Sequence, residues 1–423
     1  MKKYDEYKDS GVAWIGEVPK HWEVLRGKYV LNILSGFPFD SQKFEFEDNG
    51  VYMPLIRIRD INGSSTEVYY SGSYPIESVV KTGEVLIGMD GDFNISKWKG
   101  TNALLNQRVC KLREDSSMNT HYAFYMLSSP LKAINSVTYA TTVKHLSVYD
   151  IYNAFIPVPP ISEQTAIATY LDTHCAKIDN LISIQQKRIA LLQELKQSVI
   201  THAVTKGLNP NVEMKQSGVE WIGDVPKHWE VMPLKFTGTF GNGLTYSPKD
   251  VVDNGILVLR SSNIQNSSLS FEDNVYVSKV SRDLLVNKGD IIICSRNGSA
   301  ALVGKSAFVD KELNATFGAF MMRYIPNIEK KYGFYLFQTA IGQYKGYFST
   351  TTINQLTKTT IDEIKVPLAM AEEQAAIASY LDHKCATIDT SISNAQHQID
   401  LLQEYKQSLI TEVVTGKRKV TDN

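Results

Sequence analysis

Two long segments of nearly identical sequence constrain the fold of this chain most. EQTAIATYLDTHCAKID begins at Glu163 and EQAAIASYLDHKCATID begins at Glu373, a separation of about 210 residues that far exceeds the period of ordinary solenoid repeats. Neither segment contains Gly or Pro, and both are rich in residues that favour helix. The sequence therefore predicts a long helix over residues 161–207 and another over residues 371–417.

Apolar residues recur along both helices in alternating steps of four and three, which is the seam of a coiled coil. The shared seam positions are Leu171, Ile178, Ile182, Ile189 and Leu192 in the first helix and Leu381, Ile388, Ile392, Ile399 and Leu402 in the second. The economical partner for each seam is the other copy, packed antiparallel over about 65 Å. Lys196 and Lys406 interrupt the seams at matching positions, where polar groups lower stability but can fix register. The alternative is a pair of amphipathic helices within a globular core.

A shorter repeat, which we call the strap, precedes each helix. SGVAWIGEVPKHWEV begins at Ser10 and SGVEWIGDVPKHWEV begins at Ser217. Its Pro, Gly and Trp residues exclude a regular helix and favour an extended segment anchored by aromatic side chains. The expected domains follow the order strap, body, helix, repeated once. They are the N-terminal strap (1–24), body one (25–160), a central spacer helix (161–207), a linker with the second strap (208–231), body two (232–370), a C-terminal spacer helix (371–417) and a tail (418–423).

The two bodies differ in sequence but retain faint similarities. KTGEVLIG in body one matches NKGDIIIC in body two, and TTVKHLSVYDI matches TTINQLTKTTI. Apolar runs separated by Gly, Asn and Ser predict strands, at VYMPLIRIRDI, EVLIGM and NQRVCKL in body one and at ILVLRSSNI, DIIICS and FGAFMMRY in body two. We expect an α+β protein in which two globular α/β domains, in pseudo-twofold arrangement, are joined by an antiparallel coiled coil. Two different bodies on one duplicated frame indicate two recognition modules.

Composition excludes several classes of protein. The net charge of −1 over 423 residues rules out a global field for nucleic acid, so any basic patch must be local. Four Cys without a CxxC pair argue against a zinc site and a disulfide framework. No apolar run approaches a membrane span, and the N-terminus has no apolar signal segment. These features predict a soluble, cytoplasmic protein that has no membrane partner.

Catalytic motifs are weak throughout the chain. GSAALVGKS places one residue too many between its Gly and its Lys for a phosphate-binding loop, and GTFGNG lacks the dinucleotide-binding spacing. Asp90 and Asp92 have no third carboxylate or His nearby in sequence, which favours a turn over a metal site. We expect no catalytic and no metal-binding residues on this chain.

Polar residues at predicted strand ends suit nucleic acid better than a small ligand. Arg pairs with guanine and Asn or Gln with adenine in the major groove, while Lys binds phosphate. We expect Arg57 and Arg59 to share one strand face. The candidates are Arg57, Arg59, Lys97, Lys99, Asn106, Gln107 and Arg108 in body one and Arg260, Asn263, Arg296, Asn297 and Lys305 in body two.

Over almost its whole length, the chain resembles the specificity subunit (S subunit, HsdS) of type I restriction–modification systems. The resemblance rests on the strap, on IPVPPISEQTAIATYLD from Ile156, on DGDFNISKWKGTNALLNQRVCKL from Asp90 and on ICSRNGSAALVGKSAFVD from Ile293. The second helix entry departs from the pattern, because Ala369-Met370 replaces the usual Pro-Pro. We expect this change to alter a turn and not the role.

The resemblance implies two target-recognition domains that each recognise half of a split, asymmetric DNA sequence. The two helices would then set the gap and bind two methyltransferase subunits, which hold S-adenosylmethionine and methylate adenine. Restriction subunits would bring ATP and Mg, and the specificity chain would be non-catalytic. Two alternatives remain: a self-contained nuclease with an unrecognised site, and a protein-interaction scaffold built on the coiled coil.

Overall fold

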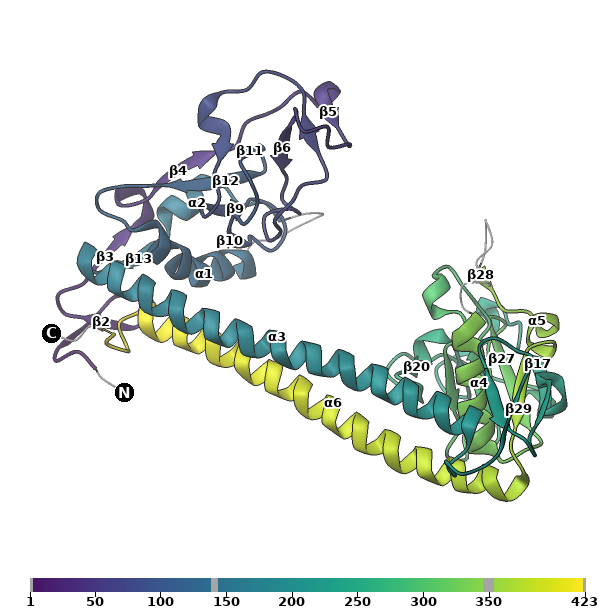
Figure 1. The fold of residues 1–423 in the computed structure, drawn as a ribbon. Helices are drawn as coiled ribbons and strands as arrows, with labels where there is room; N and C mark the ends of the chain where they lie inside the picture. Colours follow the sequence, from purple (N-terminus) through teal and green to yellow (C-terminus); the bar gives the residue numbers. More distant parts are fainter. Residues whose placement is uncertain (1–2, 138–143, 345–353, 421–423) are drawn as a thin grey trace. The chain divides into compact units, whose positions relative to one another are not determined.

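The computed structural model describes residues 3–137, 144–344 and 354–420. The chain divides into two compact units: unit 1 combines Met1–Gln185 with His397–Asn423, and unit 2 spans Gln186–Gln396. Each unit contains one strap, one body and portions of both long helices (Figure 1). Residues 1–2 of the predicted N-terminal strap and residues 421–423 of the predicted tail lie outside the described residues.

The body of unit 1 contains two sheets and two helices. One sheet has the strand order β10-β9-β12-β4 and the other has the order β5-β7-β6-β11-β8. The helices are α1 (Thr120–Val137) and α2 (Val148–Asn153), and α2 packs against the short 3-10 helix η1 (Gly27–Tyr29). The strands are β1 (Tyr7–Asp9), β2 (Glu17–Pro19), β3 (Glu23–Arg26), β4 (Asn32–Ser35), β5 (Phe44–Glu45), β6 (Met53–Ile56), β7 (Tyr69–Tyr70), β8 (Val79–Val80), β9 (Val85–Gly88), β10 (Ile95–Lys97), β11 (Ala103–Leu105), β12 (Val109–Arg113) and β13 (Phe155–Val158).

The body of unit 2 repeats this plan. Its sheets have the orders β17-β27-β23-β25 and β18-β22-β19-β26, with α4 (Lys330–Tyr344) and α5 (Lys358–Asp362) beside them, and α5 contacts the 3-10 helix η4 (Leu234–Phe236). The strands are β14 (Met214–Gln216), β15 (Asp224–Pro226), β16 (Glu230–Pro233), β17 (Gly238–Asn242), β18 (Val251–Val252), β19 (Ile256–Leu259), β20 (Ile264–Gln265), β21 (Ser268–Leu269), β22 (Tyr276–Val277), β23 (Ile291–Cys294), β24 (Arg296–Asn297), β25 (Ser306–Phe308), β26 (Ala315–Phe317), β27 (Met321–Pro326), β28 (Asn354–Gln355) and β29 (Lys365–Leu368).

A fully buried central strand organises each body. Val85 and Ile87 of β9 face the core that contains α1, while Leu86 faces a second core on the other side of the sheet. In unit 2, Ile293 and Ile292 of β23 divide between two cores in the same way. Successive side chains of a strand point to opposite faces, so a strand covered on both faces is a continuous apolar run. The runs EVLIGM and DIIICS have this property.

The long helices are α3 (Ile161–Lys206) and α6 (Ala371–Val414). In unit 1 the beginning of α3, with Leu171 and Ile178, shares a core with Leu409 near the end of α6. In unit 2 the end of α3, with Ile200, shares a core with Leu381 near the beginning of α6. Within each unit the helices therefore run antiparallel, as predicted. The predicted seam positions are all buried or half-buried: Leu171, Ile178, Ile182, Ile189, Leu192, Leu381, Ile388, Ile392, Ile399 and Leu402.

The two Lys residues that interrupt the seams form ion pairs across the helix pair. In unit 1, Lys406 Nζ lies 2.7 Å from Asp179 Oδ1, and in unit 2, Lys196 Nζ lies 2.7 Å from Asp389 Oδ1. Both Lys side chains are half-buried and both Asp side chains are exposed. A one-residue slip would separate each pair, so these contacts favour a single register.

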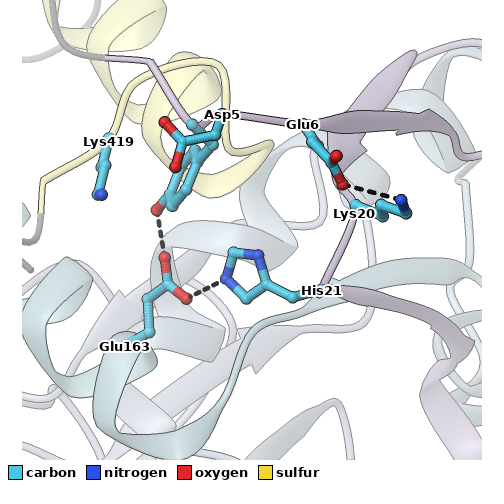
Figure 2. Close-up of a pocket in the computed structure, with 7 residues that line it drawn as sticks. Asp5, Glu6, Lys20, His21, Glu163 and Lys419 are labelled. Atoms are coloured by element: carbon cyan, nitrogen blue, oxygen red, sulfur yellow. Dashed lines mark hydrogen bonds and ion pairs between the residues drawn. The ribbon is translucent and has the colours of Figure 1, made fainter.

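The first strap is fastened to the beginning of α3 by the carboxylate of Glu163. The indole Nε1 of Trp22 donates to this carboxylate at 3.1 Å, His21 Nε2 lies 2.9 Å from it, and Tyr4 donates through its hydroxyl. Figure 2 shows Tyr4, His21 and Glu163 lining a polar cavity of about 550 Å³ beside the Lys20–Glu6 ion pair. Trp22 is fully buried, as expected for an aromatic anchor.

The second strap repeats this anchor at the beginning of α6. Trp229 Nε1 donates to Glu373 at 2.8 Å, and His228 Nε2 lies 2.9 Å from the same oxygen. Partial burial would raise the pKa of Glu373, but hydrogen bonds from His228, Trp229 and the Met370 N–H outweigh it and lower that pKa. The predicted difference between the two helix entries is thus a local one, because the same Glu and Trp meet in both.

No helix in the described part of the chain combines the length and apolarity needed to cross a membrane.

Candidate nucleic-acid interface

Each body has a polar site where the strand after the strap passes close to a neighbouring chain segment. A Cβ atom on Gly36, after β4, would lie 1.9 Å from the carbonyl oxygen of Asn106, and one on Gly243, after β17, would lie 2.1 Å from that of Gly318. No side chain can occupy either crossing. The crossings place equivalent loops of the two bodies side by side with their sheets.

Backbone hydrogen bonds define which residues of the two sites are equivalent. Met89 N donates to Arg108 O at 3.0 Å, and Ser295 N donates to Phe320 O at 2.9 Å. The next residues pair in the same way, because Asp90 bridges to His145 and Arg296 pairs with Gln355. We call Asp90, Arg108 and His145 recognition site 1, and Arg296, Phe320 and Gln355 recognition site 2.

Recognition site 1 is a charged network. His145 Nδ1 lies 2.7 Å from Asp90 Oδ1, Arg108 Nε lies 3.7 Å from Asp90 Oδ2, and Arg108 Nη1 lies 3.4 Å from His145 Nδ1. The Arg108 and His145 side chains are exposed. The site therefore presents hydrogen-bond donors that Asp90 holds in a fixed arrangement.

Recognition site 2 has a different chemistry at the same place. The guanidinium of Arg296 lies 5.4 Å from the ring centroid of Phe320, whose side chain is 59% exposed. In the residues that the structure describes, no carboxylate pairs with Arg296. The surrounding cavity of about 360 Å³ also includes Asn242, Gln355 and Lys358. Its polar groups are donors and amides, with a positive balance and an aromatic surface.

The prediction that Arg57 and Arg59 share a strand face is wrong. Strand β6 ends at Ile56, because the Asp60 carboxylate accepts the Arg57 N–H at 2.8 Å and begins a turn. Both guanidinium groups pair with Glu67, at 3.1 Å and 3.5 Å. Arg57 is largely committed to these contacts, while Arg59 remains exposed.

The same turn in body two corrects the prediction for Asn263. Its side chain is fully buried, its Oδ1 accepts the Arg260 N–H at 2.9 Å, and its Nδ2 donates to the carbonyl oxygens of Ser270 and Asp273 at 3.0 Å. No polar atom of Asn263 is left for a base edge. Arg260 itself forms an ion pair with Asp273 at 2.7 Å.

The candidates around Trp98 divide between the interior and the surface. Lys97 Nζ forms an ion pair with Asp172 of α3 at 2.7 Å and lies over the ring of Phe124. Lys97 thus joins body one to its helix, an arrangement that does not favour a DNA contact. Lys99 is exposed and stays a candidate for phosphate.

The remaining candidates lie in or near the two recognition sites. Gln107 is exposed beside Arg108, whereas the Asn106 side chain accepts the Gln107 N–H at 2.7 Å. Asn297 donates to Ser261 Oγ at 3.4 Å, and Lys305 Nζ donates to the Ser261 carbonyl at 3.3 Å. These two side chains stabilise the loop beside Arg296.

Sequence reasoning missed His145, Phe320 and Gln355. The faint match of TTVKHLSVYDI to TTINQLTKTTI aligns His145 with Gln355 and contained the signal, although residues 141–143 and 351–353 lie outside the described residues. Phe320 had no such signal, because only the fold places it against Arg296. Among residues 3–137, 144–344 and 354–420, no group of three or more His, Cys, Asp or Glu is placed to hold a metal ion.

Two copies of one α+β frame, each carrying a polar loop site of different chemistry, define a protein with two recognition modules on paired helices. A model of the family described as type I restriction modification DNA specificity domain matches residues 19–194 and 226–399. The chain belongs to this family.

Relatives and a solved structure agree with the assignment. The chain is 28% identical to the EcoBI specificity subunit of Escherichia coli, over 94% of this chain and 86% of the relative. It is 26% identical to the MjaVIII specificity subunit of Methanocaldococcus jannaschii, over 95% of this chain and 94% of the relative. A chain from a study of complex assembly and conformational transition of the type I R-M system has the same fold, with a TM-score of 0.69 and 17% identity over 94% of this chain and 98% of the other.

Proposed function

We propose that this DNA specificity subunit recognises a bipartite, asymmetric target, one half with each body. The observation that carries the proposal is the pair of equivalent recognition sites, where Asp90, Arg108 and His145 in one body become Arg296, Phe320 and Gln355 in the other. A symmetric target would require the same chemistry in both sites. Different chemistry at one backbone position suits two different half-sites.

The side chains suit direct contact with base edges. An arginine can donate two hydrogen bonds to guanine, and a glutamine can pair with the donor and acceptor of adenine. Arg296 is the strongest candidate, because Phe320 holds its guanidinium plane and no described carboxylate neutralises it. Arg108 is oriented by Asp90 and His145, so its contact would be more directional.

The chain acts with catalytic partners in this proposal. Two methyltransferase subunits would hold S-adenosylmethionine, and restriction subunits would use ATP and Mg. The names of the relatives as restriction-enzyme specificity subunits support this division of labour. The comparisons favour neither a self-contained nuclease nor a general protein-interaction scaffold.

The direct test is to express the chain with its methyltransferase subunits and sequence the methylated adenines of the host genome. We expect one split motif with two unlike halves. Methylation without a split motif, or a motif unaffected by changes in both recognition sites, would contradict the proposal. Cleavage or methylation of DNA by the purified chain alone would favour the nuclease alternative.

A further inference from the structure

One surface feature recurs in both bodies although the recognition sites differ. The 3-10 helix η1 ends with Lys28 and Tyr29, and η4 ends with Lys235 and Phe236. Backbone contacts show that the positions are equivalent, because Gly27 N donates to Ala154 O at 2.9 Å and Leu234 N donates to Ile364 O at 2.8 Å. Each 3-10 helix is therefore held to its body in the same way.

In both bodies the aromatic side chain projects into solvent with a lysine over its ring. Tyr29 is 67% exposed and Phe236 is 59% exposed. Lys28 Nζ lies 4.8 Å from the Tyr29 centroid, and Lys235 Nζ lies 5.5 Å from the Phe236 centroid. One exposed aromatic residue is ordinary on a protein surface. Its recurrence with the same cation, between bodies that have diverged elsewhere, indicates a shared role.

These lysine–aromatic pairs lie at the opposite end of the sheet from the recognition sites. Strand β4 begins just after η1, with Asn32 paired to Arg113, and ends at Ser35, next to the Gly36 crossing. Four residues of strand separate the two ends by about 13 Å. Strand β17 has the same polarity, from Gly238 after η4 to Asn242 before the Gly243 crossing.

The surface around the pair is apolar and basic in unit 1. Tyr149 on α2, which packs against η1, is exposed, and Arg26 lies 5.2 Å over the partly exposed ring of Phe155. In unit 2, Lys235 also pairs with Glu363 at 2.8 Å, which fixes the lysine beside Phe236. Exposed aromatic groups with neighbouring cations are typical anchors of protein interfaces.

We propose that the Lys28–Tyr29 and Lys235–Phe236 surfaces are two equivalent docking sites for one protein partner that binds in two copies, one on each body. An asymmetric DNA target meets different chemistry in the two recognition sites, whereas a partner present twice must meet the same chemistry twice. The cations select an acidic patch on that partner, with an apolar recess for the ring. The inference rests on the proposed function, in which the methyltransferase subunits are the partners present twice.

The test measures how many methyltransferase subunits bind the full-length chain, by native mass spectrometry and titration. Tyr29→Ser and Phe236→Ser should each weaken the binding of one subunit at least about tenfold and leave the other bound. The double variant should lose both, and Tyr29→Phe should bind like the unchanged chain. Phe271→Ser is the matched control, because Lys311 lies 5.2 Å over this ring at a place without a lysine–aromatic pair in the described part of unit 1.

Unchanged binding of two subunits by the double variant, with normal thermal unfolding, would overturn the inference. A loss of DNA affinity and of its salt dependence, with both subunits still bound, would assign the pairs to DNA phosphate and would also overturn it. If the unchanged chain bound neither methyltransferase subunits nor a split DNA target, the proposed function itself would fail.

Discussion

Arg296 and Asn263 show how one residue type on a list of candidates can have opposite fates in the fold. Asn263 is enclosed by a turn, and the backbone uses all its polar atoms. Arg296 rests on an exposed ring and keeps its donors available. A buried polar group must be satisfied within the protein, so only the second kind of residue can serve a ligand.

Replacement of Arg296 by Ala should relax or abolish recognition in the second half-site alone. The expected cost is about 1–3 kcal/mol if its contact with guanine is bidentate. Methylation rates on DNA with single-base changes measure it, and Arg296→Lys should recover charge without the paired hydrogen bonds. Equal losses in both half-sites would indicate a folding defect.

Glu373 should contribute stability that depends on pH. Its pKa is lowered from the ordinary value of 4.5, so the ionised carboxylate stabilises the folded state above that value and the contribution is lost as pH falls through the folded pKa. Glu373→Gln should cost about 1 kcal/mol at pH 7, since the group is partly exposed. Urea unfolding at pH 7 and at pH 3 should show a smaller difference between the two proteins at the lower pH. A difference that stayed constant would contradict this assignment.

At the scale of elements, ion pairs complement the apolar seam between α3 and α6. Burial alone specifies that Leu and Ile meet, but it tolerates several alignments of two long helices. The Lys406–Asp179 and Lys196–Asp389 pairs occur at equivalent places and favour one alignment. Tyr125 and Tyr335 then join each body to its helix, through Asp172 and Asp382, both at 2.7 Å.

A charge exchange tests this role of the ion pairs. Lys406→Glu should destabilise unit 1 by about 1 kcal/mol, because it places two carboxylates together, and Asp179→Lys in the same chain should restore most of the loss. Thermal unfolding of the single and double variants measures the coupling. The same exchange at Lys196 and Asp389 is the control, and its effect should add to the first. Fully additive single and double variants within one pair would show that the pair contributes nothing.

At the scale of the whole molecule, unit 1 is assembled from both ends of the chain. The C-terminal part of α6 enters its core, and the Tyr7 hydroxyl donates to the carbonyl of Gly416 at 3.0 Å. Unit 2 is one continuous segment, Gln186–Gln396. Completion of unit 1 therefore requires the last residues of the chain, whereas unit 2 can close before they are made.

Longer helices should alter the gap in the target and leave the half-sites unchanged. One heptad inserted after Gln185 and one after Gln396, where the units divide, adds about 10 Å to each helix, or about three base pairs of B-DNA. Sequencing of methylated adenines measures the new motif. A change in the half-site sequences, or an unchanged gap in a folded and active protein, would show that the helices do not set the spacing.

Much of the frame was predictable because its signals are periodic or repeated. The heptad seam predicts α3 and α6, and the runs EVLIGM and DIIICS predict the buried central strands. The turns after Ile56 and Leu259 were mispredicted as strand, because Asp60 and Asn263 capture backbone N–H groups that a strand would otherwise use. Such local competition depends on a single side chain and leaves no periodic signal.

The sequence by itself determined the duplication, the helix pair and the class of protein, since apolar periodicity and internal repeats are properties of the chain. Only the tertiary structure decided which polar side chains remain free. Arg108, Asp90 and His145 meet across turns that are distant in sequence, as do Arg296, Phe320 and Gln355. Burial and pairing are settled when the chain closes on itself, and they separate a side chain that supports a loop from one that can contact DNA.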